Sequence, residues 1–496
     1  MPRRKIREFL EWFGSKSCFI VMLVMFGISA IWIAVSSVYP MAFDEDYHLG
    51  LIKIYAHHLS PFFASQPAGT YQYGAFARDP SYLYHYLMSF PWRLVSLLTH
   101  NFTTQVITMR LINVLLFGVG IVLFRLLLLK SKISPRLIHL ALLLFILTPL
   151  TPLVAAQINY DNLLLPLLAL SLILTVNFAR QLKDHHFSWQ HASLLFALCL
   201  LTSLVKYAFL PIFVAIGVYC LWQSIKWFKQ DRHDLFIKLR TSFKQLSRLT
   251  KFGLIGLVLL SGGLFFERYG LNTLRYHSPI PECDQVLTVK QCQAYGPWKR
   301  NYDIQLSKQP KPNLNPLHFS YIWLNQMAYN LSFALNGSAS GYSVGRPLPL
   351  PNLMVVGFFS VGLLVAIICS KHLLKDEIMR LGLLLILAYL AALWLQNFTD
   401  YDHLGLPVAI QGRYLLPILI LGYVAIVVSF SRLFRDRQAL KLASASMAVG
   451  CLFLGGGAMT FILRSDPTWY WPNSKVVTMN KGARGILKPF IPGSRS

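Results

Sequence analysis

Charged residues are scarce in this sequence. They make up 13% of its 496 residues, whereas hydrophobic residues make up 55% and the mean hydropathy is +0.49. A soluble domain carries roughly 25% charged residues. The scarcity of charge therefore excludes an ordinary soluble protein and predicts a chain that folds in a lipid bilayer.

Acidic residues are the scarcer of the charged residues, with 20 Asp and Glu against 46 Lys and Arg and a formal net charge of +26. A basic protein binds nucleic acid when its basic residues share one folded surface. Here most of them lie in short segments between apolar runs. These segments alternate with less basic loops, as the positive-inside rule requires. The charge therefore predicts topology, with a cytoplasmic N-terminus, and argues against a nucleic-acid partner.

Several sequence signals are missing as well. The first apolar run, 18–38, is too long for a signal-peptide core, and no small-residue cleavage site follows it. We therefore expect this run to remain as an uncleaved anchor. There is no internal repeat. The predicted cytoplasmic side also lacks a Gly-rich phosphate loop, so nothing there points to a nucleotide cofactor.

Apolar runs of about 20 residues, the length that crosses a bilayer, recur along the chain. They predict an all-α, multi-pass protein of the cell membrane with about eleven transmembrane helices and juxtamembrane helices on the outer face. An odd number of spans puts the C-terminus outside, so 1–463 forms the membrane module and 464–496 an outer tail. The predicted spans lie near 18–38, 105–129, 137–153, 160–178, 190–204, 207–224, 251–269, 351–370, 380–396, 408–430 and 442–463.

Two long polar segments, 39–104 and 270–350, fall on the predicted outer face. In the first, apolar residues at helical spacing predict a surface helix over 46–59. An aromatic stretch over 82–98 predicts a second surface helix, which breaks at Pro91. The second segment is dense in Pro, Asn, Gly and Ser, which predicts a loop or lid with little regular structure.

Two features concern the membrane boundary. The spans 190–204 and 207–224 are short and meet at Lys206, which predicts a tight hairpin or a pair of helices that dips into the membrane. The basic, aromatic stretch 226–251 predicts either an interfacial helix on anionic lipid or a solvated linker.

Five of the seven cysteines lie in apolar runs, where a small buried thiol is an ordinary core residue. Cys283 and Cys292 instead share a polar loop on the predicted outer face. An oxidising compartment there would allow them to form a disulfide.

The run Asp44-Glu45-Asp46 follows directly after the first predicted span. Three adjacent carboxylates repel one another near lipid, so at least one should be protonated or have a cationic partner. Such an environment suits a general base or a metal ligand. The plainer reading is that acids on a solvated outer face have no special role.

Further polar residues interrupt apolar runs on the same predicted face. Asp161 either caps the helix that it begins or belongs to a site. Gln411, Arg413 and Tyr414 lie near the outer start of a predicted span, where an arginine needs a partner. That partner is either an outer-face acid or a phosphate, whose paired oxygens suit a guanidinium.

Other outer-face residues could join the same site. Lys206, Arg78 and Arg346 could bind the same anion, although each could equally be a snorkelling or loop residue. A divalent metal on Asp44, His48 and Asp402 is conceivable, but these residues lack the spacing of a dedicated metal site.

An acidic motif after the first span, a surface helix and the aromatic segment 79–87 together resemble the GT-C superfamily of membrane glycosyltransferases. Protein O-mannosyltransferases and lipid A aminoarabinose transferases belong to this superfamily. Asn159-Tyr160-Asp161 and the stretch 201–207 also resemble elements of these families. The Gln411-Gly412-Arg413-Tyr414 helix is similar to that of an uncharacterised bacterial membrane family usually grouped with them.

The resemblance implies a fold and an activity. The donor would be a polyprenyl-phosphate sugar, and transfer to a hydroxyl acceptor would occur at the outer face with inversion. By position Asp44 would be the general base, with Glu45 as the substitute because the acidic motif is long here. Arg413 and Lys206 would hold the lipid phosphate.

Two other classes of function remain open from the sequence. One is a transporter or flippase of a lipid-linked or anionic solute, which commonly shows broken helices and internal symmetry that this sequence lacks. The other is a polymerase or ligase of surface polysaccharide, which would not need Asp44. Neither the sugar, the acceptor nor the oligomeric state follows from the sequence.

Overall fold

The computed structural model describes residues 2–41, 44–230, 235–307, 315–332, 336–338, 341–343, 349–454 and 469–487. In these ranges the regular structure is helical, apart from a hairpin of two three-residue strands, β1 (Asn336–Ser338) and β2 (Gly341–Ser343). The expectation of a helical protein is therefore confirmed. The proposed boundary between 463 and 464 lies outside the described residues.

Seven helices are long and apolar enough to cross a membrane, and four shorter apolar helices accompany them. A helix of 13 to 17 residues spans roughly 20–26 Å at about 1.5 Å per residue, less than the roughly 30 Å of a bilayer core. The count of eleven spans therefore stays a prediction, although every predicted range contains a helix. The long ones are α2 (Lys16–Ser36), α5 (Phe102–Leu128), α8 (Asp161–Lys183), η2 (Tyr207–Phe209) with α10 (Leu210–Gln230), α12 (Arg248–Phe265) with η3 (Phe266–Gly270) and α13 (Leu271–Tyr276), α20 (Glu377–Leu404), and η4 (Gly412–Leu415) with α21 (Leu416–Leu433). The shorter ones are α6 (Pro135–Leu147), α9 (Trp189–Val205) and the apolar parts of α18 (Pro349–Ile368) and α22 (Gln438–Leu454).

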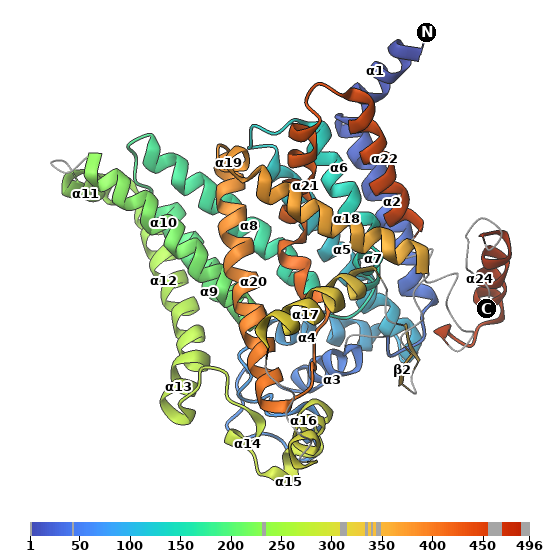
Figure 1. Cartoon of the computed structure of the whole chain (residues 1–496). Coiled ribbons are helices and arrows are strands. Elements are labelled where there is room, and N and C mark those ends of the chain that lie inside the picture. The colour runs from blue at the N-terminus through green and yellow to red at the C-terminus, as the bar shows by residue number, and fades with distance from the viewer. Residues whose placement is uncertain are drawn as a thin grey trace.

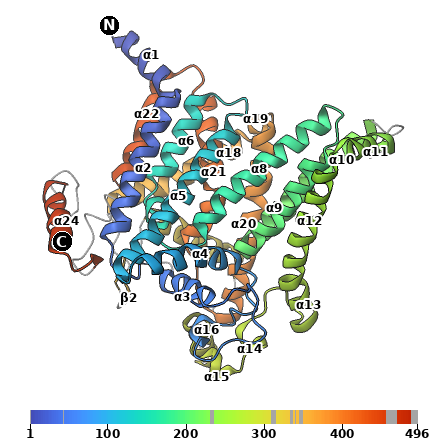
Figure 2. The ribbon, with the colours of Figure 1, turned by 180° about the vertical axis from the view of Figure 1, so that it is seen from behind.

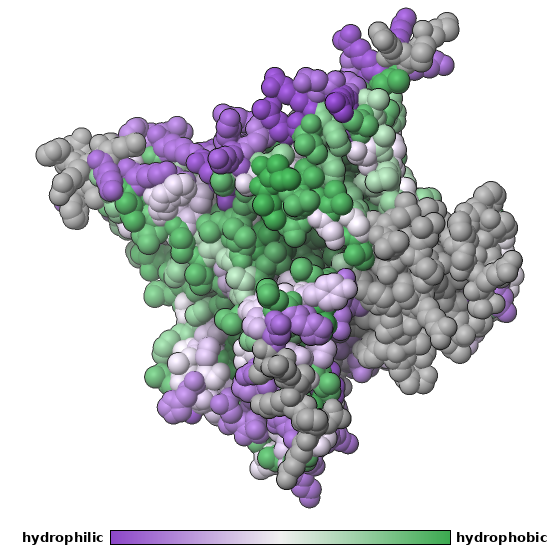
Figure 3. Space-filling view, in the orientation of Figure 1, coloured by the Kyte–Doolittle hydropathy of each residue, from purple (hydrophilic) through white to green (hydrophobic). Residues whose placement is uncertain are grey.

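The outer surface of the bundle is apolar, which a soluble protein would not tolerate. On the face shown in Figure 3 a hydrophobic belt separates two hydrophilic ends. Helix α12 contributes Leu249, Phe252 and Leu259 to this surface, each at least 70% exposed. Lipid is the solvent that suits such a belt, so the structure supports a membrane protein.

The core lies where α2, α5, α6 and α8 pack side by side, as the rear view shows (Figure 2). Phe26 of α2 stacks on Phe117 of α5, which in turn stacks on Phe145 of α6. All three rings are almost fully buried. This packing fixes the relative positions of the helices whose ends carry the polar residues.

The polar ends of the molecule differ (Figure 1). At one end lie the basic helices α1 (Pro2–Phe13) and α11 (Leu235–Gln245) with the short α19 (Ser370–Leu373). Helix α11 falls within the predicted interfacial stretch 226–251. At the other end lie α3, α14, α15 and α16, with α4 packed on α3. These are α3 (Glu45–Ala56), α4 (Leu83–Leu98), α14 (Cys283–Val286), α15 (Val289–Cys292) and α16 (Gly296–Leu306).

Both surface helices of the first polar segment are present as α3 and α4. The prediction that the second one breaks at Pro91 is wrong, because α4 continues through this proline. Met88, Trp92 and Val95 on either side of it are buried. Their packing compensates for the backbone hydrogen bond that a proline cannot donate.

The prediction of little regular structure over 270–350 is also wrong. This segment contains α13 to α16, the helix α17 (Pro316–Ser332) and the β1–β2 hairpin. Three of these helices begin at local sequence signals that the average composition does not show. Glu282 and Thr288 each form a capping box, and Pro297 lies in the first turn of α16.

The connection between α9 and α10 is as short as predicted, and the choice between a tight hairpin and a pair of helices that dips into the membrane stays a prediction. Lys206 has an extended backbone between the end of α9 and the start of η2. A single extended residue and the turn η2 therefore join the two helices, and the Lys206 side chain reaches Asp161 at the start of α8.

Candidate functional site

Asp44 and Arg413, which are 369 residues apart in the sequence, are in direct contact. The Arg413 Nη2 atom donates to Oδ2 of Asp44 over 2.6 Å. The guanidinium side chain is 4% exposed, whereas the carboxylate side chain is 48% exposed. The pair therefore presents a half-open carboxylate above a buried cation.

The backbone at Asp44 directs this carboxylate away from its own helix. Asp44 precedes α3 with a left-handed conformation, φ 66° and ψ 30°, and its side chain makes no cap hydrogen bond. Only glycine, asparagine and aspartate adopt this region readily. A residue that could cap α3 is instead turned toward Arg413.

Arg413 is positioned by the glycine before it. A Cβ atom at Gly412 would lie 2.6 Å from the Leu331 backbone nitrogen and 2.8 Å from the Met327 carbonyl oxygen, both in α17. These distances are too short for any side chain. The glycine thus lets η4 pack directly on the α17 backbone, and the next residue points to the cluster.

A second ion pair lies beside the first. Lys206 Nζ donates to Oδ1 of Asp161 over 2.7 Å, and both side chains are at most 3% exposed. Lys206 Nζ lies 4.5 Å from the ring centre of Tyr160 and 5.3 Å from that of Tyr414, and Arg413 Cζ lies 5.4 Å from the latter ring. Tyr414 therefore contacts both cations. We call Asp44, Arg413, Asp161, Lys206 and Tyr414 the ion-pair cluster.

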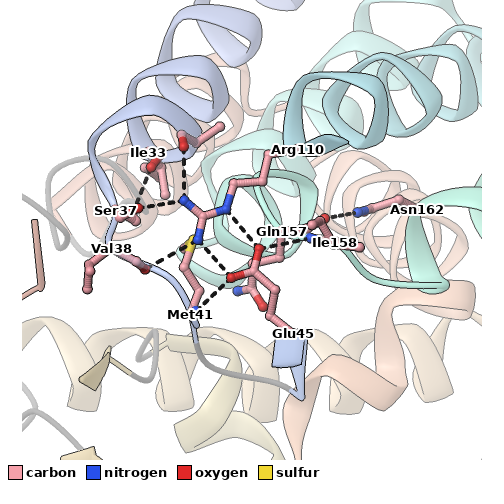
Figure 4. Close-up of polar contacts among 10 residues, drawn as sticks. Ile33, Ser37, Val38, Met41, Glu45, Arg110, Gln157, Ile158 and Asn162 are labelled. Carbon is pink, nitrogen blue, oxygen red and sulfur yellow. Dashed lines mark hydrogen bonds and ion pairs between the residues drawn. The ribbon is translucent and has the colours of Figure 1, made fainter. Parts of the chain in front are cut away.

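Glu45 has a different environment from its neighbour Asp44. Its two carboxylate oxygens accept from Arg110 Nε and Nη2 over 2.8 and 2.7 Å, and neither side chain is exposed. Backbone N–H groups of Met41 and Ile158 also donate to these oxygens (Figure 4). A carboxylate enclosed in this way has no open side for a substrate, so the geometry favours a structural role for Glu45.

Arg110 completes the network around Glu45. Its Nη1 and Nη2 atoms donate to the carbonyl oxygens of Ala34, Ser37 and Val38 at the end of α2. Figure 4 shows the contacts with Ser37 and Val38. One guanidinium thus joins α5 to the end of α2 and to the start of α3. Arg110 is not among the site residues predicted from the sequence, although an arginine within an apolar run is itself a signal of a buried partner.

The remaining residues predicted from the sequence are not part of the ion-pair cluster. Gln411 is half-buried next to η4, and its carbonyl oxygen accepts from the Tyr414 backbone N–H. Arg78 pairs with Glu267 over 3.1 Å, a partner outside the cluster that Arg268 also contacts. Arg346 lies outside the described residues. The Cys283–Cys292 disulfide is present, between α14 and α15.

The three residues considered for a metal site are not brought together. Among the described residues, no three His, Cys, Asp or Glu side chains are close enough to hold a metal ion. His48 instead shares a hydrogen bond of 2.9 Å with the buried His85, ring to ring. Burial lowers the pKa of His48 well below its usual value, and His85, Arg413 and Lys206 lower it further. Burial lowers the pKa of His85 to about 3. Both rings are therefore neutral near pH 7.

A cavity of about 500 Å³ lies next to the ion-pair cluster, between α3, α16 and the end of α20. We call it the outer cavity. Tyr47, three residues after Asp44, and Tyr207, directly after Lys206, both line it. Burial raises the pKa of Tyr295, another residue of its wall, and the nearby charges of Asp79 and Asp44 raise it further.

A second cavity, of about 440 Å³, adjoins the first and shares Tyr207 and 280–282 with it. Its other walls come from the apolar helices α10 and α20, including Leu210, Leu393 and Ala392. We call it the lateral cavity, because both helices belong to segments that are long and apolar enough to cross a membrane.

Similarity to known proteins adds nothing to this geometry. No protein-family model matches the chain, and no curated protein or solved structure matches it significantly. The site must therefore be interpreted from its own residues.

Proposed function

We propose that this protein is a membrane glycosyltransferase of the GT-C type, which moves a sugar from a polyprenyl-phosphate donor to a hydroxyl acceptor. The observation that carries the proposal is the contact between Asp44 and Arg413, with Lys206 beside them. It supports a site in which one group accepts a proton while its neighbours bind an anion.

The chemistry assigns a role to each member. The acceptor oxygen attacks the anomeric carbon and the bond to the phosphate oxygen breaks, so that the configuration inverts. Asp44 takes the acceptor proton. Arg413 and Lys206 neutralise the charge that develops on the polyprenyl phosphate as it leaves. The donor phosphate replaces the Asp44 carboxylate on Arg413, which frees that carboxylate to act as base.

The two cavities suit two substrates of different polarity. The lateral cavity, between apolar helices, would admit the polyprenyl chain from the bilayer. The outer cavity opens at the polar end and would hold the acceptor. They meet at Tyr207, the residue after Lys206, so donor phosphate and acceptor would approach the cluster from different sides.

The proposed location is the cell membrane, with eleven spans, a cytoplasmic N-terminus and the ion-pair cluster at the outer face. The basic helices α1 and α11 lie at the end opposite the cluster, as the positive-inside rule expects for this orientation. The disulfide lies at the cluster end and suits an oxidising compartment.

The test is release of polyprenyl phosphate from a radiolabelled polyprenyl-phosphate sugar by the full chain in nanodiscs. We expect Asp44→Asn to lower turnover by about 10²–10⁴-fold, the usual contribution of a general base. Arg413→Gln should lower it by about 10²–10³-fold, as loss of a charge-stabilising donor does. Asp46→Asn is the matched control, because Asp46 is the exposed neighbour of the same motif.

The outcomes separate the candidate functions. Turnover that survives both Asp44→Asn and Arg413→Gln would remove the assigned site. Absence of turnover with every donor, together with movement of a labelled polyprenyl-phosphate sugar between leaflets of proteoliposomes, would assign the cluster to transport. Chain extension of an oligosaccharide that does not need Asp44 would indicate a polysaccharide polymerase.

A further inference from the structure

The walls of the outer cavity are unusually aromatic. Trp298 and Tyr302 of α16 stack with ring centres 4.8 Å apart and planes 16° apart. On the other side the Tyr47 ring lies 6.0 Å from Tyr73 and 6.2 Å from Tyr295. All five side chains are only half-buried, so they leave ring area open to the cavity. Flat aromatic faces of this kind pack against the C–H faces of sugar rings.

The charge of the cavity is opposite to that of the whole chain. The chain has only 20 Asp and Glu against 46 Lys and Arg. Four of these scarce acids nevertheless line this one cavity, and no Lys or Arg is among its described lining residues. Arg300 of α16 does not line the cavity and donates to Asn301, although its positive charge acts on Asp400. The acids are Asp79, Glu282, Asp284 and Asp400.

The acids differ in environment. Glu282 and Asp284 are exposed, whereas Asp79 is half-buried and accepts from the Ser81 backbone N–H. Burial raises the pKa of Asp79, although the hydrogen bonds from Ser81 and the charge of Arg268 lower it. Carboxylates accept hydrogen bonds from hydroxyl groups and pair with ammonium groups, but they repel other carboxylates and phosphates.

We propose that the outer cavity binds a carbohydrate acceptor that carries no acidic groups, and that amino groups on its sugar rings strengthen binding. The aromatic walls supply the stacking surface, and the carboxylates select against acidic sugars. Calling this sugar the acceptor rests on the proposed function. The cavity lies close to the proposed base, because Tyr47 in its wall is three residues after Asp44. Binding itself does not depend on catalysis.

Three tetrasaccharides of different charge test the selection. They are the glucosamine tetramer, which is cationic, its neutral N-acetylated form, and tetragalacturonate, which is anionic. Binding to the full chain in nanodiscs is measured by calorimetry without any donor. We expect the affinity to fall in that order, with the anionic sugar at least tenfold weaker than the neutral one. Nonspecific attraction to a chain of net charge +26 would give the reverse order.

Two variants connect binding to the cavity. Trp298→Ala should weaken the neutral sugar by about tenfold, the loss of about 1.4 kcal/mol of stacking, and Trp298→Phe should restore part of it. Asp284→Asn/Asp400→Asn should reduce the advantage of the cationic sugar without weakening the neutral one. Asp303→Asn is the control for loss of a nearby carboxylate, since Asp303 lies on α16, the helix of Trp298, and does not line the cavity.

The proposal fails if tetragalacturonate binds as tightly as the neutral sugar, if no tetrasaccharide binds, or if Trp298→Ala binds all three like the wild type. It survives if sugars bind as expected while no donor is ever turned over. That result would overturn the proposed transferase and leave the outer cavity as a carbohydrate-binding site.

Discussion

The Glu45–Arg110 pair gives the sharpest test of how the site is built. Arg110→Met removes a guanidinium that pairs with both carboxylate oxygens of Glu45 and with three carbonyl oxygens at the end of α2. It leaves a buried carboxylate without its counter-charge. We therefore expect a large loss of stability at a position that no substrate touches.

The magnitude follows from the burial of the pair. Removing one partner of a fully buried ion pair costs about 3–5 kcal/mol. For a chain of 496 residues, an unfolding entropy of about 2.1 cal/mol/K per residue converts this loss to a shift of roughly 3–5 °C in Tm. Two backbone N–H donors, from Met41 and Ile158, remain on Glu45 and keep the loss within this range.

The double variant Glu45→Leu/Arg110→Met is the informative comparison. It removes both charges at once, and replacing a buried pair by apolar residues is commonly neutral or stabilising. The orphaned carbonyl oxygens at the end of α2 work against this gain. We therefore expect the double variant to lie between the wild type and Arg110→Met in thermal unfolding, followed by tryptophan fluorescence in detergent at a fixed heating rate.

Two results would refute this reasoning. The first is an Arg110→Met protein that unfolds at the wild-type temperature, because the pair would then not hold α2, α3 and α5 together. The second is a Glu45→Gln protein with unchanged Tm and abolished donor turnover, because Glu45 would then be the base and Asp44 would not.

Three further predictions concern neighbouring groups. Lys206→Met/Asp161→Leu removes the second buried pair as a unit, so we expect a Tm near that of the wild type but at least tenfold slower polyprenyl phosphate release. The pKa of His85 is about 3 in the folded state and about 6.5 in the unfolded state. Between these values only the unfolded state binds a proton at this ring. Stability therefore falls as the pH drops below about 6.5, by up to about 1.4 kcal/mol per pH unit. Burial lowers the pKa of His48 as well, so His85→Phe should make the Tm profile between pH 6.5 and 4.5 shallower without flattening it, and an unchanged profile would contradict the buried neutral ring. Cys283→Ser/Cys292→Ser opens a short loop whose closure by the disulfide stabilises the fold by about 3 kcal/mol. The segment that lines the outer cavity should then become more mobile, so tetrasaccharide affinity should fall. Donor turnover with a small acceptor should be retained.

Some features were determined by the sequence alone. An apolar run of about 20 residues satisfies its backbone hydrogen bonds in lipid within itself when it forms a helix, and every predicted span contains a helix. The surface helices α3 and α4 also followed from side-chain spacing. Composition failed over 270–350, because helix starts there depend on capping contacts at Glu282 and Thr288 rather than on the average residue type.

The pairing of charges was decided by tertiary structure. The sequence pointed to Asp44, Asp161, Lys206 and Arg413 as separate interruptions of apolar runs. It could not say that Lys206 meets Asp161 or that Arg413 meets Asp44, because those partners are 45 and 369 residues apart. Packing of distant helix ends selects them.

The different roles of Asp44 and Glu45 show the same division most clearly. As adjacent acids they could not be told apart from the sequence. In the fold, a left-handed backbone at Asp44 turns one carboxylate to a half-open site, while the start of α3 carries the next into the closed network of Arg110. The sequence supplied the charges. Only the three-dimensional arrangement of α2, α3 and α5 decided which of them stays accessible.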